Sequence, residues 1–298
     1  MSELTLGEGT RLSADNGLSA ENGATNNHPA GNGPVTGNRT EHGIGRPASR
    51  GAEVTTMIGR CLRLSRRNVE ALIMSLAMPV MLMLVFVYLF GGAINTGTPH
   101  YVTYVVPGVL LLCAGFGSSL TAVSVCQDMA GGIIDRFRSM DIGGTSAIIG
   151  HVVASTVRNL VSTALVFGIA FAIGFRPQAN ATGWLAAVGV LLLFVFALSW
   201  LSASIGLLFS SSEGANGFTF FIMFLPYASS AFVPIDTMPS WLRGFAEHQP
   251  ITSVIETLRG LLLDTPTGDN PILAVSWSAG ILAVAIVLAG VLFARRIR

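Results

Sequence analysis

Six long apolar stretches follow one another after Ala71, and charged residues lie beside some of them but almost never inside them. Each stretch is close to the roughly 20 residues that a helix needs to cross a hydrocarbon layer about 30 Å thick. The sequence therefore predicts an all-α membrane protein with six transmembrane helices. We expect these helices at residues 72–94, 102–125, 147–175, 184–209, 218–235 and 272–293.

The composition agrees with this fold class and excludes one kind of site. Hydrophobic residues make up 51% of the 298 positions and charged residues only 11%, whereas about a quarter of a soluble domain is charged. All 17 basic residues counted as Lys+Arg are arginines. A P-loop needs a lysine to reach the nucleotide phosphates, so this chain cannot carry one. The net charge of +1, spread over dispersed arginines, does not indicate nucleic-acid binding.

The arginines also predict the orientation of the helices. With the N-terminus in the cytoplasm, ten arginines flank the inner ends of the stretches and three flank the outer ends. This bias satisfies the positive-inside rule, and an even number of crossings returns the C-terminus to the cytoplasm. We expect a multi-pass protein of the cell membrane with both termini inside. The outer arginines are Arg176, Arg243 and Arg259.

Residues 1–52 differ from the rest, because they are rich in Gly, Asn, Ser, Thr and Pro. Such a segment buries too little apolar surface to offset its chain entropy, so it is predicted to be a disordered cytoplasmic tail. It contains no apolar core of a signal peptide. A regulatory or partner-binding role of the tail is the alternative. Residues 53–298 are expected to form the membrane domain.

Residues 54–69 have the 3.6-residue periodicity of an amphipathic helix. Apolar side chains fall on one arc at 100° per residue, and four arginines fall on the opposite arc. This pattern is typical of a helix that lies in the membrane interface with its cations turned toward anionic headgroups. The alternative is an ordinary surface helix, but the sequence offers no soluble core for it to cover. The four arginines are Arg60, Arg63, Arg66 and Arg67.

The connection after the second stretch is predicted to contain a short helix over 127–141. Met129, Ile133 and Phe137 fall on one apolar face of it, and charged residues point elsewhere. An apolar stripe with charged flanks suits docking on another protein, and packing on the chain's own membrane interface is the alternative. The candidate docking residues are Asp128, Gly132, Asp135, Arg136, Phe137, Arg138 and Ser139.

Two short helical patterns, at 237–245 and 249–264, precede the last stretch. They are too short to cross a bilayer and too apolar for water, so they are predicted to dip into the outer leaflet and return as a re-entrant pair. Glu256 and Arg259 are three residues apart and can pair, which lowers the cost of either charge at that depth. The candidate residues of this segment are Gln249, Pro250, Glu256 and Arg259.

No metal or catalytic set is indicated. The three cysteines have no CxxC spacing, and the five histidines are scattered. Ser118, Ser119 and Ser202 have no evident base in the same leaflet, which disfavours an intramembrane hydrolase. The central parts of the apolar stretches hold no Asp, Glu or Lys, which disfavours coupling to an ion gradient. Ser202 and Gly206, four residues apart, are candidates for a close helix contact.

Three stretches carry a resemblance to the membrane subunits of type-2 ABC exporters, and the daunorubicin-resistance permease group is the most similar. They are Met78-Pro79 through Phe90-Gly91-Gly92, then residues 132–139, and then Gln249-Pro250-Ile251-Thr252 with Glu256 and Arg259. The resemblance covers residues 54–298. Asp141 stands where related sequences tend to have proline, and Thr257 where alanine is common.

The resemblance implies a six-span permease with an N-terminal interface helix, a cytoplasmic coupling helix and the re-entrant pair. It also implies that two permeases form a homodimer and that separate ATP-binding subunits, which hold ATP and magnesium, dock on the coupling helices. The chain itself is then expected to hold no cofactor or metal and to be no enzyme. The implied function is ATP-driven export of an amphipathic drug or antibiotic.

Aromatic and Met side chains suit varied amphipathic ligands, and they suggest a substrate path along the second and fifth stretches. Three alternatives remain open: an exporter of a lipid, glycolipid or polysaccharide precursor, an ion-coupled carrier, and a non-transporting membrane scaffold. Apolar lining alone cannot choose the cargo. The candidate path residues are Phe116, Ser119, Thr121, Phe218, Phe221 and Met223.

Overall fold

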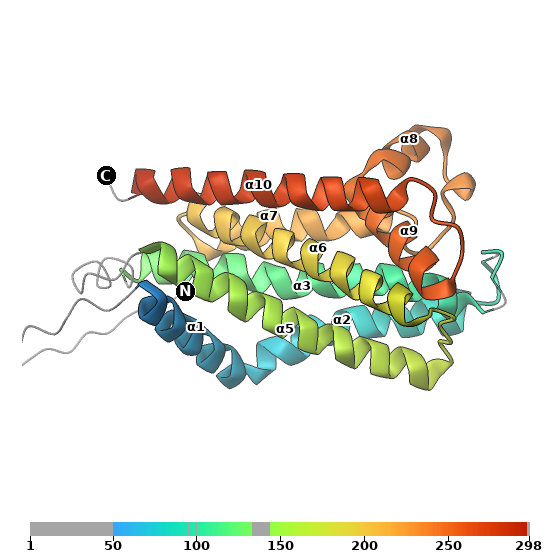
Figure 1. The fold of residues 1–298 in the computed structure, drawn as a ribbon, viewed down its shortest axis with the longest axis horizontal. Coiled ribbons are helices and arrows are strands. Elements are labelled where there is room, and N and C mark those ends of the chain that lie inside the picture. Colours follow the sequence, from blue (N-terminus) through green and yellow to red (C-terminus); the bar gives the residue numbers. More distant parts are fainter. Residues whose placement is uncertain (1–49, 95, 99, 133–143, 297–298) are drawn as a thin grey trace, which may run out of the picture. The chain divides into compact units, whose positions relative to one another are not determined.

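The computed structural model describes residues 50–94, 96–98, 100–132 and 144–296, and all regular structure within these ranges is helical (Figure 1). The chain divides into two units at Gly45, and every described residue belongs to the second, Arg46–Arg298. The predicted tail therefore lies outside the described residues, except that residues 50–52 already belong to the first helix. The all-α fold class is confirmed for the part of the chain that the structure describes.

The helices follow one another with short connections. Four of those described are long and apolar enough to cross a membrane, namely α3, α5, α6 and α10. The complete order is α1 (Arg50–Arg67), α2 (Val69–Val85), the π-helix η1 (Phe86–Phe90), α3 (Tyr101–Ala130), α5 (Gly144–Ile173), α6 (Ala181–Leu208), α7 (Ser212–Phe224), the 3₁₀ turns η2 (Leu225–Ala228) and η3 (Ile235–Thr237), α8 (Ser240–His248), α9 (Pro250–Leu263) and α10 (Asn270–Arg296).

Two helices run five or six residues beyond a predicted end. Helix α3 continues to Ala130, so residues 127–130 belong to it and do not begin a new helix. No Gly or Pro occurs between the predicted end at Val125 and Gly131, and Gly132 then takes the left-handed conformation with φ of +64°. Helix α7 begins six residues before the predicted fifth stretch, because the Ser211 side chain accepts a hydrogen bond from the Gly214 N–H at 3.2 Å and caps it.

The fifth stretch is also interrupted where the sequence has a proline. Helix α7 gives way to the 3₁₀ turn η2, which contains Pro226, and residues 229–233 have no helical structure. The ring of proline cannot continue the α-helical hydrogen-bond ladder. The helical part of this segment is therefore 212–228, which is displaced from the predicted 218–235.

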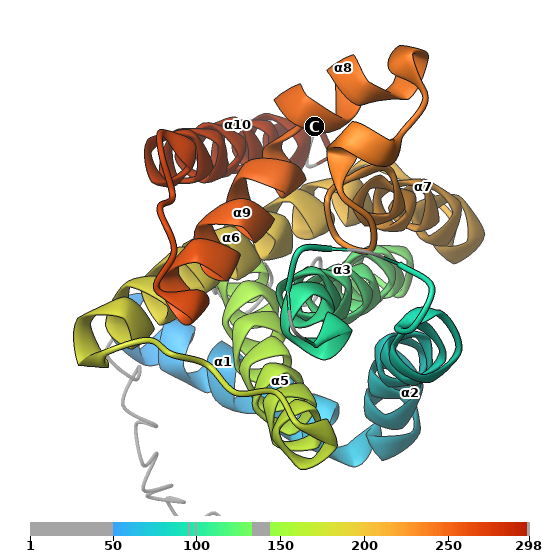
Figure 2. The same cartoon turned by 90° about the vertical axis from the view of Figure 1, so that its right-hand side faces the viewer.

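Helix α3 lies at the centre, and α2, α5, α6 and α7 surround it (Figure 2). Its first half is apolar on nearly all sides, which is typical of a helix that other helices cover. Val105, Val106 and Val109 have no exposed surface, and the same core includes Ile255 of α9. The central position of α3 makes it the helix through which the others contact one another.

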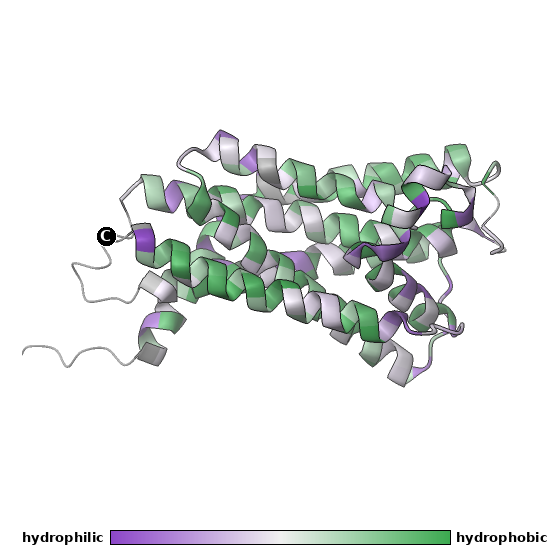
Figure 3. Cartoon of the chain, turned by 90° about the horizontal axis from the view of Figure 1, so that it is seen from above, coloured by the Kyte–Doolittle hydropathy of each residue, from purple (hydrophilic) through white to green (hydrophobic). Residues whose placement is uncertain are grey.

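Most connections lie at one of the two ends of the helix bundle, whereas the break between α1 and α2 lies between them (Figure 1). The start of α1, the end of α3, the start of α5, the α6–α7 connection and the end of α10 lie at one end. Helices α8 and α9 and the α5–α6 connection lie at the other end. Hydrophobic residues predominate along the middle of the helices and polar residues gather near the ends (Figure 3).

The outward surface of α10 is apolar as well. Ile272 is 70% exposed, and Val284 and Val287 are about as exposed at 64% and 66%. A soluble protein rarely exposes so large an apolar face, whereas lipid chains are a favourable environment for it. The bundle is therefore built to lie in a membrane.

Helices α3 and α6 approach closely at Gly206. A Cβ at this position would lie 2.5 Å from the Ala122 carbonyl oxygen and 2.9 Å from the Val125 Cβ. The close contact predicted from the small residues at 202 and 206 is thus confirmed for Gly206. Only glycine lets the two backbones pack at this distance.

Substituting Gly206→Ala should destabilise the fold by about 1–3 kcal/mol, because the methyl group must push α3 and α6 apart. The measurement is the thermal unfolding midpoint of the purified chain in detergent. Gly189→Ala on the same helix is the matched control, since no atom lies within 4 Å of its would-be Cβ. Equal unfolding midpoints for the two variants would contradict a tight α3–α6 contact.

Candidate functional site

Helix α1 packs along the first part of α5. Met57 and Cys61 of α1 are buried, and a Cβ on Gly150 of α5 would lie 3.1 Å from the backbone of Met57. Arg63, Arg66 and Arg67 are exposed on the other side of α1. The amphipathic helix is therefore confirmed, and α5 covers much of its apolar arc. Its contact with lipid headgroups stays a prediction.

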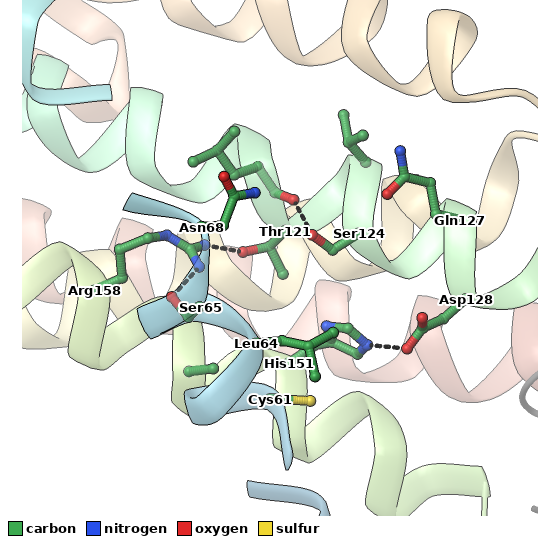
Figure 4. Close-up of a pocket in the computed structure, with 13 residues that line it drawn as sticks. Cys61, Leu64, Ser65, Asn68, Thr121, Ser124, Gln127, Asp128, His151 and Arg158 are labelled. Carbon is green, nitrogen blue, oxygen red and sulfur yellow. Dashed lines mark hydrogen bonds and ion pairs between the residues drawn. The ribbon is translucent and has the colours of Figure 1, made fainter. Parts of the chain in front are cut away.

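Asp128 links three helices near the connection between α3 and α5. Arg60 of α1 donates a hydrogen bond from Nη1 to Asp128 Oδ2 at 3.0 Å. His151 Nε2 of α5 lies 2.9 Å from the same oxygen, a contact that Figure 4 shows. The Asp128 and His151 side chains are each only 13% exposed. These contacts hold the end of α3 to α1 and α5. The carboxylate of Asp128 is thus engaged in contacts within the chain.

The charge states on α1 follow from this contact and from burial. The hydrogen bond to Asp128 raises the pKa of Arg60 above its already high ordinary value, so the guanidinium stays charged. Burial raises the pKa of the Cys61 thiol to about 11. The thiol is therefore protonated and a poor nucleophile at neutral pH. This agrees with the interpretation of Cys61 as an apolar filler.

Substituting Asp128→Asn should loosen α1, because it removes the charge that holds Arg60 and His151. We expect backbone hydrogen exchange in α1 to become about tenfold faster, the equivalent of roughly 1.4 kcal/mol for a partly buried pair. Hydrogen exchange with mass spectrometry on the purified chain measures this. Glu70→Gln, an exposed carboxylate at the start of α2, is the matched control. Unchanged exchange in α1 would show that the ion pair contributes nothing.

Arg158 lies on α5 seven residues after His151 and so farther from the α3–α5 connection. Its Nη1 donates to Ser65 Oγ at 3.2 Å, and its Nη2 donates to the Gly117 carbonyl at 3.0 Å and to Thr121 Oγ1 at 2.9 Å. A cavity of about 410 Å³ lies between α1, α3 and α5 beside these groups (Figure 4). Arg158 therefore joins the same three helices that Asp128 joins.

A second polar cluster lies at the opposite end, around Arg259 of α9. Its Nη2 donates to the Ser230 carbonyl at 2.7 Å, and Nε and Nη2 donate to the Tyr104 carbonyl at 3.3 and 3.1 Å. The guanidinium also lies 3.7 Å from the centroid of the Tyr104 ring. The predicted pair with Glu256 forms at 2.5 Å. Arg259 thus ties α9 to α3 and to the segment after η2.

The two helices of the predicted re-entrant pair have different surroundings. Helix α9 begins at Pro250 and is buried along most of its length against α3, α6 and α10. Gln249, just before it, donates a side-chain hydrogen bond to the Ala228 carbonyl. Helix α8 is peripheral, and its Trp241 is 78% exposed. Entry of this pair into a lipid leaflet stays a prediction.

The candidate path residues are not brought together within one copy of the chain. Met223 is buried, with its Cγ 3.8 Å from a would-be Cβ on Gly115, whereas Phe221 is 70% exposed. Ser119 donates to the carbonyl of Phe116 in its own helix. Thr121, which contacts Arg158, belongs to the cavity beside α1. The side chain of Phe218 lies outside the described part.

Most of the candidate docking residues also lie outside the described ranges: Asp135, Arg136, Phe137, Arg138 and Ser139. Asp128 and Gly132 are described, at the end of α3 and just after it. Among the described residues, no group of three or more His, Cys, Asp and Glu side chains could hold a metal ion.

The sequence of this chain matches a known family of membrane proteins. A profile of the ABC-2 type transporter family matches residues 52–263, and the chain belongs to this family. It is a multi-pass membrane protein and an ABC transporter permease, as the resemblance predicts.

Its curated relatives are drug-resistance permeases. The chain is 28% identical over 256 residues, 84% of this chain and 90% of the relative, to the daunorubicin resistance ABC transporter permease protein DrrB1 of Streptomyces coeruleorubidus. It is 24% identical over 234 residues, 78% of this chain and 85% of the relative, to the probable doxorubicin resistance ABC transporter permease protein DrrC of Mycobacterium tuberculosis.

The contacts of Asp128 and Arg158 are not among the predictions from the sequence, although the spacing of polar residues on α3 and α5 indicates them. Thr121 and Asp128 are seven residues apart on one helix, and His151 and Arg158 are seven apart on the next. Residues seven apart share a helix face, so two polar faces of matching spacing indicate a possible contact between the helices. Which faces meet depends on how α3 and α5 pack.

Proposed function

We propose that this chain is the membrane-spanning permease subunit of an exporter that is driven by ATP and carries amphipathic small molecules out of the cell. The observation that carries the proposal is the alignment with drug-resistance permeases over most of both chains. The sequence has no lysine for a P-loop, so ATP and magnesium belong to a separate ATP-binding subunit.

Six membrane crossings are part of this proposal. Helix α2 with η1, and helix α7 with η2, add two apolar helical segments to the four membrane-length helices. In the chain order α2, α3, α5, α6, α7 and α10, successive helices run in opposite directions along the bundle (Figure 1), which fits a chain that crosses back and forth. The arginine bias favours placing both termini in the cytoplasm. Helices α8 and α9 would then lie in the outer leaflet.

The ATP-binding subunit would dock on the α3–α5 connection, through residues such as Arg136 and Arg138. The support for this site is the position of Asp128. It lies at the end of α3, five residues before the undescribed segment 133–143 begins, and it holds α3 to α1 and α5. A push on this connection would therefore move three helices together.

Helix α7 is the candidate contact with a second copy of the chain. Phe220, Phe221 and Phe224 on this helix are 54%, 70% and 54% exposed. Exposed aromatic side chains on a membrane helix suit contact with another subunit or with an apolar ligand. We place the substrate path of a homodimer along this aromatic face, which contains one of the candidate path residues, Phe221.

Transport into inside-out vesicles tests the cargo. Vesicles that contain the chain and its co-purifying ATP-binding subunit should accumulate daunorubicin when ATP is added and should not with a non-hydrolysable analogue. A fluorescent phospholipid in the same vesicles is the comparison. ATP-dependent movement of the lipid without drug accumulation would favour the lipid-precursor alternative over drug export.

A further inference from the structure

Arg158 is a cation in a membrane-length apolar helix, and its contacts are all with neutral groups. They are the hydroxyls of Ser65 and Thr121 and the carbonyl of Gly117, and its Nε is buried with no hydrogen-bond partner. No ion pair to Arg158 occurs among the described residues, and Asp128 pairs with Arg60 and His151. Charges in a membrane pair with one another or with backbone carbonyls, and Arg158 has one such carbonyl, so an anion from outside the chain would stabilise it further.

The guanidinium of Arg158 lies beside the junction between the amphipathic helix α1 and the apolar helix α2. Ser65 is close to the end of α1, and Asn68 lies in the break before α2 begins. Arginines are exposed on α1 up to Arg67, whereas α2 is almost wholly apolar. In the proposed topology, on which this inference rests, the start of α5 is cytoplasmic, and Arg158 lies in the half of α5 nearer to the cytoplasm. A phospholipid that reaches Arg158 would therefore come from the inner leaflet.

The cavity beside Arg158 has the chemistry of an amphiphile site. Its volume of about 410 Å³ falls within the range of small-molecule sites. Ser65, Thr121 and Gln127 supply polar groups on one part of the wall, and Figure 4 shows Ser65 and Thr121 against the guanidinium. Leu64 and Val123 supply apolar surface, and Leu64 is 52% exposed.

We propose that this cavity binds the phosphate group of an anionic amphiphile, with Arg158 as the counter-charge, and that the amphiphile is a phospholipid of the inner leaflet. Arginine suits this ligand because its planar guanidinium can donate two parallel hydrogen bonds to phosphate. The acyl chains would leave past Leu64 onto the apolar surface of the bundle. A bound lipid would hold α1, α3 and α5 together beside the α3–α5 connection, so anionic lipid would affect transport.

The test is phosphatidylglycerol binding to the purified full-length chain in detergent, followed by native mass spectrometry and by displacement of a fluorescent phosphatidylglycerol. Arg158→Gln should weaken binding tenfold or more. Arg176→Gln removes the same charge from the exposed α5–α6 connection and should change binding less than twofold. Millimolar inorganic phosphate is the competitor that distinguishes a lipid from a soluble phosphate compound.

The outcomes separate the possibilities. Loss of lipid binding in Arg158→Gln with no displacement by phosphate supports the phospholipid. Displacement by inorganic phosphate that requires Arg158 supports the same phosphate chemistry with a soluble source. Equal lipid affinity of the native chain and Arg158→Gln overturns the proposal. If Arg158→Gln does not fold, Leu64→Trp narrows the cavity without changing charge, and unchanged lipid binding in that variant overturns the proposal as well.

Discussion

Substituting Arg259→Gln is expected to destabilise the chain by about 2–4 kcal/mol, because it removes buried hydrogen bonds to two backbone carbonyls and a part-buried ion pair. The side chain of Arg259 is 9% exposed. It donates to the carbonyls of Tyr104 and Ser230 and pairs with Glu256. Glutamine is too short to replace these contacts, and it leaves the carboxylate of Glu256 without its partner. The measurement is thermal unfolding of the purified chain in detergent.

Arg176→Gln is the matched control for this variant. Arg176 also donates to two backbone carbonyls, those of Phe171 and Phe175, but it is exposed. Its loss should cost less than about 1 kcal/mol, because water replaces the lost hydrogen bonds. Similar destabilisation by the two variants would mean that the buried cluster around Arg259 contributes no more than a surface contact.

The double variant Arg136→Ala and Arg138→Ala is expected to abolish ATP-dependent export. In the proposed function these arginines belong to the surface on which the ATP-binding subunit docks, and buried interfacial charges often cost 2–5 kcal/mol or more when removed. ATP-dependent drug uptake by vesicles, normalised to the amount of chain in the membrane, is the measurement. Pull-down of the ATP-binding subunit by the variant is the second readout.

Arg11→Ala with Arg39→Ala removes the same number of charges from the predicted tail and serves as the control. Export by this variant should remain at the native level. Undiminished export by a well-expressed variant at 136 and 138 would show that coupling does not depend on these two arginines.

Most of the helices can be predicted from this sequence, because the length and polarity of a segment largely determine whether it forms a membrane helix. A run of apolar residues long enough to cross the bilayer has to be helical, and the predicted stretches at 147–175 and 184–209 end within three residues of α5 and α6. The amphipathic helix α1 follows equally from its apolar arc, although Arg60 turns to Asp128 and only the other three arginines are exposed. Errors occur where a helix end depends on a cap or on a single break, as at Ser211 and Gly131.

The polar contacts are less predictable, because they depend on how helices far apart in the sequence are packed. Glu256 and Arg259 are on one helical turn, so their pairing follows from spacing alone. The contact of Arg158 with Ser65 joins residues 93 apart. The two side chains contact each other only because α1 packs along α5. Gly150 allows this close packing, but a glycine in the sequence does not by itself predict it. Residue type indicates that Arg158 needs a partner, and only the fold indicates which one.

Transport by purified protein in closed liposomes tests the central claim most directly. The claim is that this permease provides a membrane path and takes its energy from a separate ATP-hydrolysing subunit. Liposomes with the chain alone, under an imposed proton or sodium gradient, should not accumulate daunorubicin against its gradient. Liposomes that also hold the ATP-binding subunit should accumulate it when ATP is supplied on the side of that subunit. Uphill accumulation by the chain alone would contradict the claim.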